Sequence, residues 1–333
     1  MSKVLRCVFL IGLVCTTMVY AGGRRDAAGG VRTLRVGSSM AFGTVEVLAA
    51  QEFGRLLEEY SGGTMRVEVL AGGLAGGERE IVESQQLGIM DMSVVSGILQ
   101  NFDPAMMIME WELLFVNEDH VRKVWGGPIG QQIFDRLVQT TDIRILSTFM
   151  RTPRLMTTNR PINSIGDLTG LRLRVPEMAA RMALWEALGA SPTPMAFPEV
   201  YSALQTGTID GQENPISAIL NARFYEVANY LAITNHVYGF MFLTIAEPVW
   251  QSFNEQQRGW VTSAARRAAL FNDREVRIRE QQELEYVKAR MNVTFPDTSG
   301  WRARTADVYR RFLHVEGFEA LYRAIVEAGR AFE

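Results

Sequence analysis

Short apolar runs alternate with longer amphipathic segments along most of the chain. Runs that favour strands stand at Leu34–Val36, Arg66–Leu70 and Met90–Val95. Between the first two, apolar residues recur three and four positions apart, as on one face of a helix. These residues are Val45, Leu48, Ala49, Phe53, Leu56 and Leu57. We therefore predict a helix from about Thr44 to Tyr60, and the alternation of strands and helices is typical of an α/β protein.

A glycine-rich run at Gly72–Gly77 precedes a second predicted helix, from Glu78 to about Leu87. The glycines superficially resemble a dinucleotide-binding loop. They follow the second strand, however, and lack both the G-x-G-x-x-G spacing and the acidic residue expected on the next strand. We interpret them as the loop that leads into the helix.

The pattern continues beyond residues 148–159, where the chain is expected to leave a first lobe. The predicted elements are a strand at Leu171–Val175, a helix from Pro176 to about Leu188, a strand at Pro192–Met195, a helix at Pro198–Gln205 and a strand with a turn at Gly207–Asn214. Proline suits the first turn of both helices, because its missing N–H would have no partner there.

A long helix is predicted near the C-terminus. Residues Ser252–Glu255 fit a capping box, and no proline follows before Pro296. A helix over Asn254–Met291 would be about 57 Å long at ~1.5 Å per residue. Such a helix must protrude, form a coiled coil or lie across two lobes, and the absence of a sustained heptad weakens the coiled-coil interpretation.

The N-terminus has the pattern of a secretory signal peptide. Lys3 and Arg6 precede an apolar run, Cys7–Tyr20, and small residues at positions 19 and 21 favour cleavage after Ala21. The run of about 14 residues is shorter than the ~20 that span a membrane. Retention as an anchor and lipidation at Cys15 are alternatives, although the residues before Cys15 fit a lipidation site poorly. We predict a signal peptide over residues 1–21 and a periplasmic protein.

Composition excludes several classes of function. Both cysteines lie in the predicted signal peptide, so the mature chain can have no disulfide, thiolate metal site or cysteine nucleophile. The net charge of −3 leaves no basic excess for nucleic acid. The three histidines are far apart, and the chain has no phosphate-binding P-loop or H-E-x-x-H motif. We therefore predict no catalytic residue, metal or cofactor. The length of 333 residues is typical of two domains.

Arg174 is the residue that most suggests a ligand. It lies at the end of the strand Leu171–Val175, just before a predicted helix, where open α/β sheets bind ligands. A guanidinium beside helix N–H groups can bind a carboxylate. The alternative is an edge strand on which Arg172 and Arg174 are solvated, and the strand pattern alone favours that alternative.

Several motifs in order resemble the solute-binding proteins of tripartite ATP-independent periplasmic (TRAP) transporters, of the DctP type. They are Leu173–Pro176, Gly189–Phe197, Glu199–Tyr201, Ala203–Gly207 and Asp210–Pro215. The resemblance implies two α/β lobes joined by crossing strands, with a long helix across both and a cleft that closes on an organic acid. We expect residues 31–152 with 240–280 to form lobe I, and residues 153–239 with 281–333 to form lobe II.

The resemblance also implies a set of ligand-binding residues. Arg174 matches the family's carboxylate-clamping arginine, Arg154 a second cleft arginine, and Asn214 the asparagine that hydrogen-bonds the carboxylate. Phe197 matches a ring packed against the ligand, although an ordinary core position is an equal alternative.

Departures from the family pattern concern the substrate. Residues Ser93–Leu99 lack the acidic residue and the arginine that sialic acid-binding relatives have there. Ser39 and Ser96 are further candidate contacts, and Tyr238 lies in an apolar stretch that offers more cleft wall. A cleft with few polar side chains apart from its arginines predicts a monocarboxylate with an apolar portion.

The resemblance further implies partners. A small-molecule carboxylate ligand and a TRAP membrane permease are expected, and some members also use a tetratricopeptide-repeat protein. Two alternatives remain at this point: a secreted α/β hydrolase, which the absence of a G-x-S-x-G element disfavours, and a scaffold of the same fold that has lost its ligand.

Overall fold

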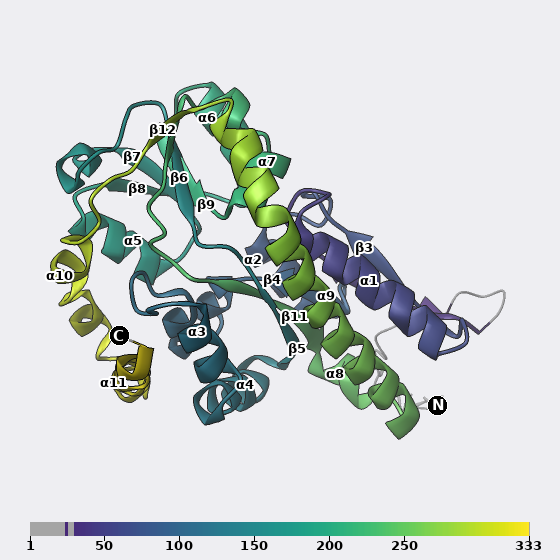
Figure 1. Cartoon of the computed structure of the whole chain (residues 1–333). Helices are drawn as coiled ribbons and strands as arrows, with labels where there is room; N and C mark the ends of the chain where they lie inside the picture. The colour runs from purple at the N-terminus through teal and green to yellow at the C-terminus, as the bar shows by residue number, and fades with distance from the viewer. Residues whose placement is uncertain (1–23, 26–29, 333) are drawn as a thin grey trace, which may run out of the picture.

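Two six-stranded sheets organise the residues that the structure describes (Figure 1). The structure is a computed structural model that describes residues 24–25 and 30–332. The predicted signal peptide, residues 1–21, lies outside the described residues.

The first sheet is built from both early and late parts of the chain. Its strands are β1 (Arg24–Arg25), β2 (Arg32–Gly37), β3 (Met65–Leu70), β4 (Met92–Val95), β5 (Ile143–Met150) and β11 (Phe240–Ala246). Their order is β1-β2-β4-β11-β5, and β3 pairs with β2. Strand β2 is parallel to β3 and β4, whereas β11 is antiparallel to β4 and β5.

The second sheet contains the segments that carry the family motifs. Its order is β12 (Asn292–Thr294), β10 (Tyr230–Ala232), β6 (Leu155–Thr158), β9 (Gly211–Asn214), β7 (Arg172–Val175) and β8 (Ser191–Pro194). Strand β7 lies between β8 and β9 and is parallel to both. The edge-strand alternative for Arg174 is therefore wrong, because β8 pairs with β7 on the side away from β9 and is itself the edge strand.

Helices pack against the faces of the two sheets (Figure 1). They are α1 (Val45–Tyr60), α2 (Glu78–Gln86), α3 (Glu118–Trp125), α4 (Pro128–Thr141), α5 (Ala179–Ala187), α6 (Val200–Gln205), α7 (Ile216–Asn221), α8 (Glu247–Gln251), α9 (Glu255–Lys288), α10 (Trp301–Thr305) and α11 (Phe318–Gly329). The described residues also form short 3₁₀ helices: η1 (Gly97–Asn101), η2 (Pro104–Glu110), η3 (Ile165–Leu168), η4 (Phe197–Glu199), η5 (Phe224–Glu226), η6 (Val308–Phe312) and η7 (Arg330–Phe332). No helix in the described part of the chain is both long enough and apolar enough to cross a membrane.

Helix α9 runs along both halves of the molecule (Figure 1). Its 34 residues give a length of about 51 Å at ~1.5 Å per residue. Val261 and Ala268, near its start, pack in the core of α1 and the first sheet. Val287, near its end, packs in the core beside α6 and α7. The capping box lies at Asn254 and Gln257, so the position predicted at Ser252–Glu255 is wrong by two residues.

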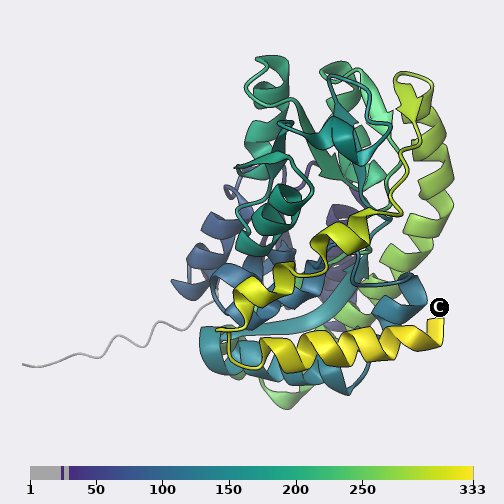
Figure 2. The same ribbon diagram turned by 90° about the vertical axis from the view of Figure 1, so that its left-hand side faces the viewer.

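The C-terminal segment returns to the side of the first sheet (Figure 2). Strand β12 still pairs with β10 of the second sheet. Helix α11 then contacts α3, α4 and η2, and the Phe318 ring lies 5.3 Å from the Trp111 ring. The division into lobes stays a proposal, and we propose it with one change: the residues from α11 onward belong with lobe I.

Candidate functional site

A hollow opens where the carboxyl ends of strands from both sheets meet. The empty space that its lining residues enclose is about 430 Å³, part of which is open solvent. Arg174 and Asn214 lie at the ends of the parallel strands β7 and β9, and Phe197 follows β8. Ser96 follows β4 of the other sheet. All four line the hollow, as does Arg154.

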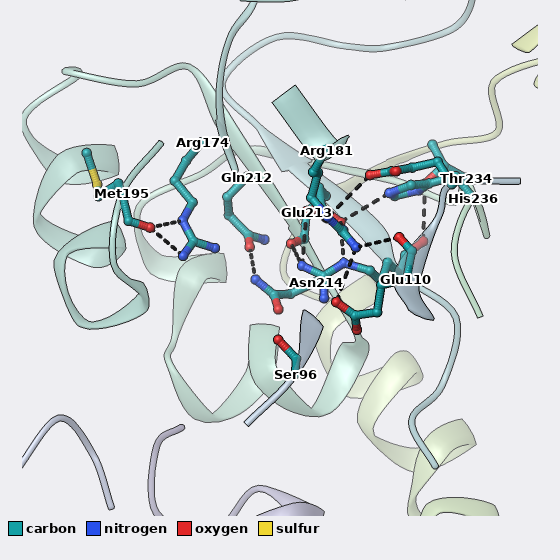
Figure 3. Close-up of polar contacts among 12 residues, drawn as sticks. Ser96, Glu110, Arg174, Arg181, Met195, Gln212, Glu213, Asn214, Thr234 and His236 are labelled. Carbon is teal, nitrogen blue, oxygen red and sulfur yellow. Dashed lines mark hydrogen bonds and ion pairs between the residues drawn. The ribbon is translucent and has the colours of Figure 1, made fainter. Parts of the chain in front are cut away.

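Arg174 is a buried cation at the end of β7 (Figure 3). Its Nε and Nη2 donate hydrogen bonds to the carbonyl of Met195 at 2.9 and 2.6 Å. The other buried arginines, Arg151, Arg154 and Arg181, each lie within ion-pair distance of a glutamate. No ion pair joins Arg174 to any described residue. Burial lowers the pKa of its guanidinium to about 9, because the charged form loses hydration, yet the group stays cationic at neutral pH.

A chain of amides orients Asn214 beside Arg174 (Figure 3). The parallel register of β7 and β9 pairs Arg174 with Gln212, two positions before Asn214 on the same face. Gln212 donates to the Thr157 hydroxyl at 2.8 Å, and its oxygen accepts from Asn214 Nδ2 at 2.7 Å. The second N–H of that amide remains for a ligand oxygen.

Phe197 lies between the hollow and the core. Its ring centroid is 5.9 Å from the Arg174 guanidinium carbon and 5.7 Å from the Phe224 ring. One face of the ring therefore lines the hollow and the other packs in the hydrophobic core. The two predicted roles, a ring against the ligand and an ordinary core position, are compatible.

Arg154 lines the hollow but is already paired. Its Nε contacts the Glu213 carboxylate, and its Nη2 donates to Glu213 Oε1 at 3.0 Å and to the Glu213 carbonyl at 2.6 Å. Burial lowers the pKa of Arg154 while the Glu213 charge raises it. Arg154 therefore offers a ligand fewer free donors than Arg174 does.

A buried ionic cluster lies behind the hollow. Arg181 of α5 contacts Glu110, Glu112 and Glu213 at 3.3, 3.3 and 3.1 Å. His236 Nε2 is 3.2 Å from Glu213. Burial opposes ionisation of Glu213, but Arg154 and Arg181 hold its pKa well below the usual value. Glu213 is therefore charged and fixes the position of Arg154.

The wall on the side of the first sheet contains a buried carboxylate. Glu78 begins α2, and its Oε2 accepts from the Ser96 hydroxyl at 2.8 Å. Burial raises the pKa of Glu78. At the mouth of the hollow, Arg79 Nε lies 3.8 Å from the Glu177 carboxylate, so the two sides of the hollow are linked by an ion pair.

The structure does not bring every predicted residue to the hollow. Ser39 is buried beside it, with a hydroxyl that has no hydrogen-bond partner among the described residues, and only its neighbour Met40 lines the wall. Tyr238 packs against the core of η2, α3 and α4. Helix α5 begins at Ala179, so Pro176, expected to start it, lies instead in the wall of the hollow.

Sequence reasoning missed Glu78, Arg79 and Arg151 as wall residues. The expectation of few polar side chains apart from Arg154 and Arg174 is therefore wrong. A signal for Glu78 was present, since it is the first residue of a helix after a parallel strand. Among residues 24–25 and 30–332, no cluster of three or more His, Cys, Asp or Glu side chains could hold a metal ion.

Comparison with known proteins gives a consistent result. The model of one family, described as bacterial extracellular solute-binding protein, family 7 (DctP), matches residues 36–315. A solute-binding protein of Roseobacter denitrificans is 38% identical over 254 residues, which are 76% of this chain and 78% of that protein. The sialic acid-binding periplasmic protein SiaP of Vibrio cholerae is 32% identical over 282 residues, which are 84% and 88% of the two chains.

The fold is also that of a solved structure. A TRAP periplasmic solute-binding protein from Roseobacter denitrificans, crystallised with bound L-galactonate, matches with a TM-score of 0.84 at 33% identity. The match covers 88% of this chain and 98% of that one. The two-lobed α/β fold predicted from the sequence is thereby confirmed.

Proposed function

Because the chain belongs to the DctP family of bacterial extracellular solute-binding proteins, as its motifs predicted, we propose that it binds an organic acid at Arg174 in the hollow between the two sheets. Proteins of this class bind small acids and work with a membrane permease. Asn214 and Phe197 complete the carboxylate site, as an amide donor and an apolar wall.

One observation carries the proposal: Arg174 is a buried guanidinium that forms no ion pair with a carboxylate of the described residues. Burying a charge without a partner is costly, so such a charge is retained where a ligand supplies the partner. A carboxylate matches the guanidinium because two parallel N–H donors can meet its two oxygens.

The charges around the hollow favour a single carboxylate. Three of its four arginines are balanced: Arg79 by Glu177, Arg151 by Glu46 and Arg154 by Glu213. Arg174 is the remaining arginine and has no such ion pair, so we propose a ligand with one carboxylate, which would pair with it.

Polar groups in the wall favour a hydroxylated acid over one with a long apolar tail. Glu78 and Ser96 already form a hydrogen bond with each other, and each can form a further one with a ligand hydroxyl, whereas an apolar tail offers neither of them a partner. The relatives agree in type, because one has L-galactonate bound and another is a sialic acid-binding protein. We propose a hydroxylated monocarboxylate of similar size.

Function at the membrane follows from the family. We propose that the chain is exported, cleaved after Ala21, and delivers its ligand chemically unchanged to a TRAP permease. Membership of a family of binding proteins favours this over the hydrolase alternative. A tetratricopeptide-repeat partner and a scaffold role stay predictions without support from the site.

Calorimetry with a panel of acids tests the proposal. The panel contains six-carbon aldonates, hexanoate and the matching neutral sugar alcohols. We expect at least one aldonate to bind, and its sugar alcohol, which lacks the carboxylate, to bind at least 100-fold more weakly. Equal affinity for an acid and its alcohol would contradict a carboxylate site at Arg174.

A further inference from the structure

Arg151 is the second unusual arginine of the hollow. It lies between β5 and β6, three positions before Arg154, and its side chain is only 3% exposed. Its backbone N–H donates to the Gly239 carbonyl at 3.1 Å, which fixes the start of the side chain. Arg151 lines the hollow on the side of the first sheet.

Glu46 balances the charge of the Arg151 guanidinium, but two of the guanidinium nitrogens have no hydrogen-bond partner among the described residues. Its Nε lies 2.5 Å from Glu46 Oε1. The N–H is not directed at that oxygen, however, and neither Nε nor Nη2 has a hydrogen-bond partner in the described part of the chain. A buried donor without a partner costs free energy, so a wall that contains one is built for a ligand acceptor.

Arg151 and Glu78 face the same part of the hollow. Both line it, and the Arg151 charge acts on the Glu78 carboxylate. Together they present a donor and an acceptor, the complement of a hydroxyl group, which can both accept and donate. Because Glu46 balances its charge, Arg151 suits a neutral oxygen rather than a second carboxylate.

We propose that Arg151 is a specificity-determining residue that donates from Nη2 to a ligand hydroxyl beyond the carboxylate. This inference rests on the proposed function, since Arg174 must hold the acid for Arg151 to reach its hydroxyl groups. A site of this kind binds a ligand analogue that lacks the hydroxyl much more weakly, because the buried polar groups of the protein then have no hydrogen-bond partner.

The test compares hydroxylated and plain acids on two variants. Arg151→Lys keeps a cation beside Glu46 but removes Nη2. The double variant Arg151→Met with Glu46→Leu removes the pair as a unit, so that no buried charge is left alone. Arg144→Lys is the matched control, because Arg144 pairs with Glu247 outside the hollow. Calorimetry measures binding of L-galactonate, D-gluconate and hexanoate, with melting temperature as the check on folding.

We expect the wild type to bind an aldonate at least 100-fold more tightly than hexanoate. Arg151→Lys should weaken the aldonate roughly 10- to 100-fold, the loss of one hydrogen bond from a charged donor, and change hexanoate less than threefold. The double variant should show the same selective loss, and Arg144→Lys no change beyond threefold.

Three results would overturn the inference, and they are distinguishable. If the folded variants lose affinity for aldonate and hexanoate equally, or for neither, Arg151 does not read the hydroxyl. If the wild type binds hexanoate as tightly as the aldonates, the hydroxyl site is wrong while the carboxylate site stands. If the wild type binds none of the acids, the proposed function fails as well.

Discussion

Arg172 and Arg174 stand two positions apart on β7 and have opposite surroundings. Arg172 is half-exposed and forms an ion pair with Asp210 at 2.6 Å. Arg174 is buried at the end of the strand with no carboxylate partner. The strand pattern alone favoured solvation for both arginines, because the pattern of one strand does not indicate which other strands pair with that strand. Only the family motif separated them.

Glu283 of α9 supports a prediction about pH. It is buried, and no hydrogen bond or ion pair joins its carboxylate to another residue in the described ranges. Burial raises its pKa from 4.5 to about 7. Its contribution to stability is therefore fully present below pH 4.5 and is lost as the pH rises through about 7.

We predict that Glu283→Gln raises the free energy of unfolding at pH 8 by ~1–3 kcal/mol relative to wild type. The difference should shrink toward zero near pH 4.5, where the wild-type carboxyl is protonated. Urea unfolding between pH 4.5 and 8 measures it, with the exposed Glu285→Gln as control. A constant difference across this range would show that ionisation of Glu283 is not its cause.

At the scale of elements, the periodic segments were predictable and the site between them was only partly so. Helix α1 lies within one residue of its predicted start because its apolar stripe packs on the first sheet. Arg174, Asn214 and Phe197 were placed by motif resemblance. Arg151 could not be found, since a lone arginine between two strands has no periodic pattern and its partner Glu46 is far away in sequence.

The glycine-rich loop before α2 has a role that its sequence did not reveal. It lies against residues 195–198, which follow β8 of the other sheet. A Cβ added at Gly73 would lie 3.2 Å from Pro198, and one at Gly77 would lie 3.0 Å from the Ala196 Cβ. The loop thus allows the two sides of the hollow to approach closely.

We predict that Gly77→Ala weakens ligand binding about 5- to 150-fold, the range for ~1–3 kcal/mol of overpacking. The φ angle of −76° accepts alanine, so the backbone itself is not strained. The double variant Gly77→Ala with Ala196→Gly moves the methyl group across the contact and should recover most of the affinity in calorimetry. No recovery would mean that the loss arises within the loop, for example at the start of α2, and not from the contact.

At the scale of the whole molecule, the site depends on segments that join the two sheets. The buried cluster of Arg181, Glu213 and His236 gathers side chains from α5, from β9 and from the crossing between β10 and β11. Helix α9 contributes to a core on each side. The return of α11 to the first sheet was not predictable. An amphipathic pattern predicts that a helix packs with its apolar face against a core, but it does not indicate which of the cores that is.

The central claim is that Arg174 holds the ligand's carboxylate, and substitution at this residue tests it most directly. Removing one partner of a desolvated ion pair costs ~3–5 kcal/mol, so Arg174→Ala should weaken calorimetric Kd for the tightest acid of the panel by roughly two to three and a half orders of magnitude. Arg174→Lys should keep the charge yet lose much of the affinity, because lysine cannot form two parallel hydrogen bonds. Arg172→Ala, on the same strand, should change Kd less than threefold. If circular dichroism shows intact folding and both Arg174 variants bind within threefold of wild type, the carboxylate site is not at Arg174.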